Sequence, residues 1–374
     1  MISLRRRSTL VVPAAALLLV YASAQDVRSH RAPRLTAQQS GTINRLQAVS
    51  PVNSRIVWVS GVNGTYAVTT DGGEHWKPGV VAGAETLQFR DVQGISEKVA
   101  YLLSAGTGTD ARVYKTEDGG ESWSLQFENR DPNAFYDCFA FWTPKRGIAM
   151  SDSVDGQFPV IETTDGVSWQ DIGNRLPTAQ AGEAAFAASG TCVATQGKRR
   201  AWIGTGGAEK ARILATTDGG DTWSAYDTPI VQGTASSGVF SVDFRDPIHG
   251  ILGGGELAAP TTIAETLARS NDGGRTWKLV SEAPFPGAIY GLSYVRELHG
   301  DSEESDSDEA DDRAASHGSR SVVITGPSGA AWSPDEGDRW FTLPGLKNYW
   351  AVAFASPHAG WLVGTDGRIV KISF

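Results

Sequence analysis

The chain has 374 residues, of which 40% are apolar and 20% are charged, a composition typical of a globular protein rather than of a disordered chain. Its formal net charge is −9 and no basic face is apparent, so nucleic acids and anionic membrane surfaces are not expected partners.

The N-terminus is predicted to be a signal peptide that covers residues 1–24. Three arginines at positions 5–7 precede an apolar run from Leu10 to Val20, and Ala22-Ser23-Ala24 provides a small-residue cleavage site before Gln25. A membrane anchor is the alternative, but the run is short for a bilayer and Pro13 interrupts it. We therefore expect a secreted or periplasmic protein in which residues 25–374 form a single domain without membrane insertion.

Six segments share one pattern, in which an Asp and one or two Gly residues are followed by a Trp. They are Thr70–Trp76, Glu117–Trp123, Thr164–Trp169, Thr217–Trp223, Asn271–Trp277 and Pro334–Trp340. Their Trp residues are 47, 46, 54, 54 and 63 positions apart, and a spacing this regular indicates structural repeats.

The physics of this pattern is that of a β-hairpin turn. The Asp side chain accepts hydrogen bonds from loop amides, Gly supplies a positive φ, and the Trp is expected to bury its ring beneath the turn. These residues are therefore predicted to be structural rather than catalytic. They are Asp71, Trp76, Asp118, Trp123, Asp165, Trp169, Asp218, Trp223, Asp272, Trp277, Asp335 and Trp340.

Each turn is expected to join the last two strands of a four-stranded unit. In the fifth repeat, β-type runs at 241–244, 249–254 and 267–270 precede the turn, and a fourth strand begins at Trp277. Four-stranded units of roughly 45–50 residues are typical of propeller blades. No amphipathic helix of useful length competes with this interpretation.

The blade count is predicted to be seven. A last unit has three strands, at 349–354, 360–364 and 367–372, and the segment Arg34–Thr42 can supply its fourth. The predicted fold is thus an all-β, seven-bladed propeller with four-stranded antiparallel blades, closed by an N-terminal strand in the last blade. Six blades with a leftover stub is the alternative.

The motif Ser/Thr-x-Asp-x-Gly-x-x-Trp resembles the Asp box of bacterial neuraminidase repeats (BNR). With the Gly-Trp-x-x-Gly strand at Gly360–Gly364, the unit is similar to propellers of the photosystem II stability/assembly-factor type, over about residues 34–374. The resemblance implies an exported propeller. Photosynthetic members of that group act as assembly scaffolds through a basic surface patch, and the acidity of this chain argues against that role here.

A sialidase-like hydrolase is an alternative function, because the repeat motif is shared with sialidases. Such an enzyme needs three convergent arginines, for which Arg45, Arg90 and Arg112 are candidates, and a Tyr-Glu nucleophile pair, for which Tyr136 and Glu183 could serve. The sialidase Arg-x-Pro signature is not clear within the blades. A quinone-dependent oxidoreductase is a weaker alternative, and no cofactor or metal site is predicted.

The channel mouth, where loops enter the first strand and join the second to the third, is the predicted ligand-binding site. Its candidate residues are Asp137, Asp152, Asp155, Glu183, Arg212 and Glu256. Convergent carboxylates could bind a cation or a basic ligand or act as acid and base, or they could simply solvate the mouth or pair with arginines. The nearby aromatic residues are predicted to serve blade packing; they are Tyr136, Phe240, Tyr290 and Trp350.

Two cysteines, Cys138 and Cys192, are expected at different depths of neighbouring repeats. They could form a disulfide in an oxidising compartment or remain two buried thiols, and the sequence leaves both open. A separate acidic insertion at about 297–319 is predicted to be disordered, because eight of the residues between Asp301 and Arg313 are acidic.

The leading functional hypothesis is a non-catalytic, monomeric binding or scaffold protein that holds a protein or glycan at the channel mouth. The alternative, a hydrolase at the same mouth, requires two carboxylates roughly 5–10 Å apart that face an open pocket. A third possibility is an assembly chaperone for an exported complex.

Overall fold

The computed structural model describes residues 32–296 and 319–374, and residues 32–374 form one compact unit. The predicted signal peptide and nearly all of the predicted acidic insertion lie outside the described residues.

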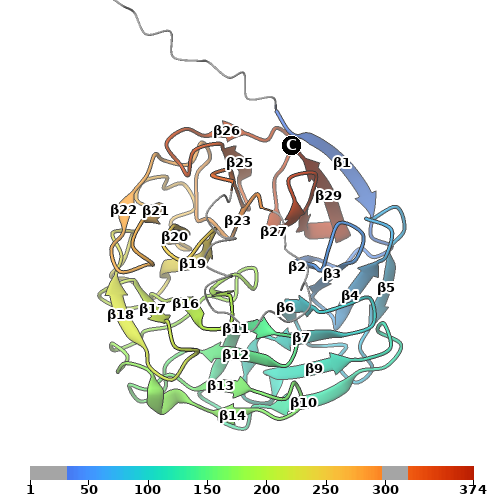
Figure 1. Cartoon of the computed structure of the whole chain (residues 1–374), viewed down its shortest axis with the longest axis horizontal. Coiled ribbons are helices and arrows are strands. Elements are labelled where there is room, and N and C mark those ends of the chain that lie inside the picture. Colours follow the sequence, from blue (N-terminus) through green and yellow to red (C-terminus); the bar gives the residue numbers. More distant parts are fainter. Residues whose placement is uncertain (1–31, 297–318) are drawn as a thin grey trace, which may run out of the picture. The chain divides into compact units, whose positions relative to one another are not determined.

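The unit is a seven-bladed β-propeller, as predicted, and its sheets are arranged in a ring (Figure 1). Blade 1 contains β2 (Leu46–Pro51), β3 (Val57–Gly61), β4 (Thr65–Thr69) and β5 (Lys77–Val80). Blade 2 contains β6 (Phe89–Gly94), β7 (Ala100–Ser104), β9 (Arg112–Thr116) and β10 (Ser124–Glu128). Blade 3 contains β11 (Phe135–Thr143), β12 (Arg146–Ser151), β13 (Val160–Thr163) and β14 (Gln170–Asp171), and the short β8 (Gly106–Thr107) adds to it.

The remaining blades repeat this order. Blade 4 contains β15 (Val193–Gln196), β16 (Arg200–Gly204), β17 (Arg212–Thr216) and β18 (Ser224–Asp227). Blade 5 contains β19 (Ser237–Phe244), β20 (Gly250–Glu256), β21 (Leu267–Ser270) and β22 (Lys278–Leu279). Blade 6 contains β23 (Gly291–Tyr294), β24 (Val322–Gly326), β25 (Gly329–Ser333) and β26 (Phe341–Thr342). Three short 3₁₀ turns complete the described elements: η1 (Gly108–Asp110), η2 (Gly173–Arg175) and η4 (Thr365–Gly367).

Blade 7 is built from both ends of the described chain. Its strands β27 (Tyr349–Ser356), β28 (Ala359–Gly364) and β29 (Arg368–Ser373) are joined by β1 (Arg34–Gln39), which pairs antiparallel with β29 (Figure 1). This confirms the predicted closure and the count of seven against six blades and a stub. The ring cannot open here without breaking the ladder between β1 and β29.

The hydrophobic core lies between neighbouring sheets, so both faces of each blade are apolar. Three tryptophans, Trp58, Trp202 and Trp361, occupy the same place in the second strands of their blades, and all are fully buried. The indole nitrogens of Trp58 and Trp202 donate hydrogen bonds to carbonyls of the next blade, at 2.8 and 2.9 Å. Blades 1 and 4 are therefore each held to the next blade by packing and by a polar contact, whereas the buried indole nitrogen of Trp361 has no hydrogen-bond partner.

The six recurrent Asp turns connect the third and fourth strands of blades 1 to 6. In blade 1, Thr69 donates from its hydroxyl to Asp71 at 2.8 Å, and Asp71 accepts from the His75 amide at 3.0 Å. In blade 2, hydrogen bonds from the Ser122 hydroxyl and amide hold the pKa of Asp118 at about 2. Three of the following tryptophans are buried, whereas the other three are only half-buried; the buried ones are Trp76, Trp223 and Trp277.

Candidate binding site

The innermost strands carry a repeated β-bulge close to the residues where they begin. The face of the propeller on which these strands begin is called the channel mouth below. In five blades the register shifts around one residue: Gln47, Arg90, Asp137, Phe240 and Trp350. Tyr290 occupies the corresponding place before β23, where its amide donates to the Thr325 carbonyl at 2.9 Å. A bulge redirects a side chain, so neighbouring blades present these residues toward one mouth.

Aromatic residues of blades 4 to 7 follow one another around part of this mouth, and we call Phe186, Phe240, Tyr290 and Trp350 the aromatic arc. Ring centroids are 4.2 Å apart for Phe186 and Phe240, 6.1 Å for Phe240 and Tyr290, and 5.8 Å for Tyr290 and Trp350. Phe240 is fully buried, but the other three rings are half-buried. The arc therefore packs the blades together and also leaves ring surface available at the mouth.

Two arginines, Arg45 and Arg90, continue the ring in blades 1 and 2 and are called the arginine pair. The Arg45 guanidinium lies over the Trp350 ring, 5.2 Å from its centroid, and its Nε is buried without a hydrogen-bond partner. Arg90 donates to Gln88 Oε1 at 2.9 Å, and burial followed by the charge of Arg45 lowers its pKa. Among the described residues, neither arginine has a carboxylate within 4.0 Å. Two half-buried cations thus lie together with no carboxylate in direct contact, although the charge of Asp137 acts on Arg90 and raises its pKa.

Two predicted mouth residues, Asp137 and Asp152, are brought into hydrogen-bond contact. Asp137 is 2% exposed and its Oδ2 has no donor, while Asp152 accepts from the Ala185 amide at 2.9 Å. Burial raises the pKa of Asp137 well above its ordinary value, and the Asp152 carboxylate raises it further. Burial also raises the pKa of Asp152 to about 6, against the Ala185 and Asp137 hydrogen bonds that lower it. Both carboxyls of the pair therefore hold their protons more tightly than a solvated aspartate does.

This pair predicts a stability that falls as pH rises. The folded protein binds the Asp152 proton more tightly than the unfolded chain, so the associated stability is present below about pH 4 and is lost as pH passes about 6. A rise of about 2 pKa units corresponds to about 3 kcal/mol. We expect Asp152→Asn to make this slope shallower in denaturant unfolding between about pH 4 and pH 6 without removing it, because the buried Asp137 also binds its proton more tightly in the folded protein. Asp155→Asn is the control, because Asp155 is an exposed turn residue at φ 52° where Asn is well tolerated. An unchanged slope in Asp152→Asn would show that the pair does not titrate in this way.

The other predicted mouth residues do not join this cluster. Glu183 is fully buried and accepts hydrogen bonds from Arg212, from Thr205 and from the Gln180 amide. Glu256 accepts from the hydroxyls of Thr234 and Ser236, and Asp155 is exposed in its turn. Glu183 and Arg212 are therefore one neutralised internal pair, and Glu256 holds its own loop.

The hydrolase arrangement is not assembled by the residues proposed for it. Arg112 pairs with Glu128 at 3.3 Å, away from the arginine pair, and Tyr136 is buried against Phe127 with ring centroids 5.3 Å apart. Asp137 and Asp152 touch instead of standing apart, and Arg212 neutralises Glu183. These side chains do not provide two separated carboxylates beside an open pocket.

Sequence reasoning missed the residues from Ala184 to Cys192, here called the channel-crossing segment. The first strand of blade 4 begins only at Val193. The preceding segment contacts residues that belong to four other blades. Arg90 of blade 2 donates to the Ala187 carbonyl at 3.4 Å, and Ser189 donates to the Tyr290 carbonyl of blade 6 at 2.6 Å. The sequence offers no distinctive signal for this segment, because the 54 residues between the third and fourth turns equal the next interval.

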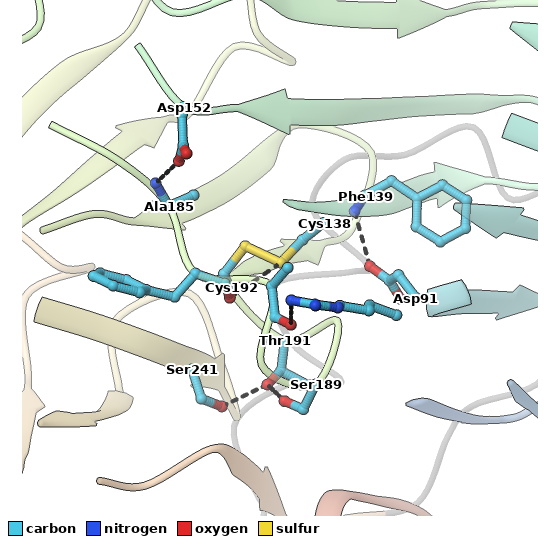
Figure 2. The surroundings of a disulfide bond; sticks show 12 residues. Asp91, Cys138, Phe139, Asp152, Ala185, Ser189, Thr191, Cys192 and Ser241 are labelled. Carbon is cyan, nitrogen blue, oxygen red and sulfur yellow. Dashed lines mark hydrogen bonds between the residues drawn. A yellow bond between two sulfur atoms is a disulfide. The ribbon is translucent and has the colours of Figure 1, made fainter. Parts of the chain in front are cut away.

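Cys138 and Cys192 form a disulfide, with Cα atoms 6.0 Å apart (Figure 2). The expectation that they lie at different depths is wrong. Cys138 pairs with Met150 directly after the bulge of β11, and Cys192 lies opposite Gly204 directly before β15, so both stand at the same level of neighbouring innermost strands. Blade 4 does not begin with a bulged strand as five other blades do, so the spacing of the repeats does not place Cys192 correctly.

No helix in residues 32–296 and 319–374 is long and apolar enough to cross a membrane. In the same residues, no group of three or more His, Cys, Asp or Glu side chains is placed to hold a metal ion.

The fold and the mouth define the chain as a seven-bladed β-propeller, and comparison with solved structures agrees. No protein-family model matches the chain, and no curated protein matches it. A structure described as YCF48 bound to D1 peptide superposes with a TM-score of 0.60 at 14% identity, covering 92% of this chain and 96% of that one. YCF48 from Cyanidioschyzon merolae gives a TM-score of 0.60 at 16% identity, covering 92% and 99%.

A third structure, the WD40 β-propeller domain of Doa1, gives a TM-score of 0.55 at 14% identity, covering 90% of this chain and 95% of that one. Identities this low establish a shared fold and no more. At that level, the two YCF48 structures support the predicted propeller fold.

Proposed function

We propose that this chain is a non-catalytic binding propeller that holds an extended segment of a partner protein at the channel mouth. The observation that carries the proposal is the arginine pair beside the half-buried rings of the aromatic arc. Tyr, Trp and Arg are the residue types that contribute most to protein–protein binding energy, particularly where they are clustered and partly shielded from water.

The chemistry of the mouth favours a peptide that has both apolar and acidic groups. The rings of Tyr290 and Trp350 offer flat apolar surface, and the unpaired guanidiniums of Arg45 and Arg90 offer donors for a carboxylate. One structural neighbour, YCF48, is described as bound to a D1 peptide, which is a protein ligand on the same fold. A glycan is the other ligand class expected from the sequence, and an uncharged glycan would gain less binding energy from the two arginine side chains.

The proposed setting is outside the cytoplasm, after removal of residues 1–24, with the six recurrent turns belonging to the Asp-box class. The basic start, apolar run and small-residue site of the N-terminus support export. The internal disulfide between Cys138 and Cys192 is consistent with an oxidising compartment. N-terminal sequencing of the exported protein should begin at Gln25, whereas a product that retains residues 1–24 would contradict export with cleavage.

Selection from a random peptide library, with a glycan array in parallel, tests the function. We expect selected peptides to bind the wild-type protein, and Trp350→Ala and Arg90→Gln each to weaken binding about tenfold or more, which corresponds to about 1.4 kcal/mol or more. Isothermal titration calorimetry measures the effect. Phe341→Ala is the matched control, because Phe341 is an aromatic residue exposed on the outermost strand of blade 6.

Two results would contradict the proposal. Selected peptides whose affinity is unchanged by both mouth substitutions would place binding elsewhere. Binding of glycans without peptides would replace the protein ligand with a carbohydrate.

A further inference from the structure

The channel-crossing segment is attached mainly to blades other than its own. The Ala185 amide donates to Asp152 of blade 3 at 2.9 Å, and the Thr191 hydroxyl meets the Ser241 hydroxyl of blade 5 at 2.8 Å (Figure 2). Together with its contacts to Arg90 and Tyr290, the segment reaches from blade 2 to blade 6. It spans the channel at the level of the aromatic arc.

The segment is seated closely against blade 2 as well. A Cβ atom placed on Gly190 would lie 2.3 Å from Asp91 Oδ1, and Gly190 has φ +74°. Asp91 is itself fixed by the amides of Val92 and Phe139, each at 2.8 Å. The path of the segment is therefore specific, and Gly190 is required for it.

One covalent bond fixes the end of this segment. Cys192 is its last residue, and the disulfide ties it to Cys138 of β11, the innermost strand of blade 3 (Figure 2). The segment contains no strand of its own, and Phe186, which it carries, is the blade 4 member of the aromatic arc. Besides this bond, its placement rests on side-chain hydrogen bonds and on backbone hydrogen bonds that join Ala184 to Gly206 and Thr191 to Val242.

The ring of blades does not depend on that bond. Strand β15 starts one residue after Cys192, and all seven sheets keep their four main strands without the segment. Closure is provided separately, by the pairing of β1 with β29. Formation of the blades and completion of the mouth can therefore be separate steps, because the blades can assemble before Phe186 reaches its place in the aromatic arc.

We propose that the Cys138–Cys192 disulfide completes the binding face, so that the propeller folds without it but binds its partner only after oxidation. This rests on the proposed function of the mouth, whose partner-binding state it assigns to an oxidising compartment. Without the bond, the channel-crossing segment is released, the aromatic arc loses Phe186, and binding must then include the entropic cost of ordering the segment.

The two cysteines can be oxidised to the disulfide by a second molecule that itself carries a disulfide. One cysteine thiolate attacks the oxidant disulfide and forms a mixed disulfide with loss of one thiol. The second thiolate then attacks the protein sulfur of that mixed disulfide and releases the other thiol. Two electrons and two protons pass from the protein to the oxidant. Both cysteines are fully buried in the finished structure, so the reaction precedes final seating of the segment, which afterwards shields the bond.

The test compares Cys138→Ala/Cys192→Ala with the wild-type protein by hydrogen–deuterium exchange and by binding of a peptide selected on the wild type. We expect amides of residues 185–191 to exchange about 100-fold faster in the variant, with strands β20 and β29 unchanged. The peptide should bind about tenfold more weakly or worse. Wild-type protein produced reduced should show the same loss and recover binding on treatment with oxidised glutathione.

Leu362→Ala is the control for general destabilisation, because Leu362 is fully buried in blade 7, away from the mouth. It should not deprotect residues 185–191 selectively. Wild-type protection of these residues in the cysteine variant, uniform deprotection of the whole chain, or undiminished peptide affinity would each overturn the inference. A wild-type protein that binds no peptide would instead refute the proposed function, and the inference with it.

Discussion

Deletion of residues 34–39 from the full chain is expected to lower the free energy of unfolding by roughly 3–6 kcal/mol, at about 1 kcal/mol for each ladder hydrogen bond lost. These residues form β1, which runs from Arg34 opposite Ser373 to Gln39 opposite Arg368. Its loss leaves β29 with an unpaired edge and exposes apolar surface of blade 7. Denaturant unfolding measures the change, and size-exclusion chromatography should show aggregation.

The closing strand also reaches across to blade 1, which provides a matched control. Gln38 donates to the Gly72 carbonyl at 3.0 Å and accepts from the Trp76 indole at 3.2 Å. Gln38→Ala removes only this bridge and should cost about 1–2 kcal/mol, with the ring intact. If the deletion were no worse than Gln38→Ala, the pairing of β1 with β29 would not be what closes the ring.

The blades could be predicted from the sequence because their signals are local and repeated. An Asp turn needs only residues within four positions of one another, as in the contacts of Asp71 with Thr69 and His75. Six such turns determine where hairpins occur, and the missing strand of the last unit then indicates that an N-terminal segment must close the ring. The closed ring of seven blades can therefore be inferred from the number of local Asp turns.

The mouth could be predicted only in outline, because its contacts connect residues far apart in the chain. Asp137 and Asp152 were both assigned to the mouth, and the bulge of β11 and the register of β12 place them next to each other. Glu183 and Arg212 were both named as mouth residues, but their ion pair was not predicted, because nothing in the sequence indicates that they are in contact. The channel-crossing segment breaks the repeat, so a method that aligns repeats misplaces Cys192.

Blade 6 departs from the repeat at one position, and the departure predicts a large effect. Glu336 stands where the corresponding turn of blade 1 has Gly72, and it adopts the same left-handed backbone, with φ 58°. Its buried carboxylate accepts from Arg245 at 2.6 Å and from Arg320 at 3.1 Å. These ion pairs offset the unfavourable backbone, and the one with Arg245 joins blade 5 to blade 6.

We expect Glu336→Gln to lower the free energy of unfolding by about 3–5 kcal/mol, because it leaves Arg245 with one fewer counter-ion in a buried site. Glu336→Gly separates the two contributions. It relieves the positive-φ strain by about 1 kcal/mol while it removes the same ion pairs, so it should be destabilised somewhat less than Glu336→Gln. Thermal and urea unfolding of both variants measure the difference. A Glu336→Gly protein as stable as the wild type would mean that the network between blades 5 and 6 contributes nothing beyond compensating for its own strained residue.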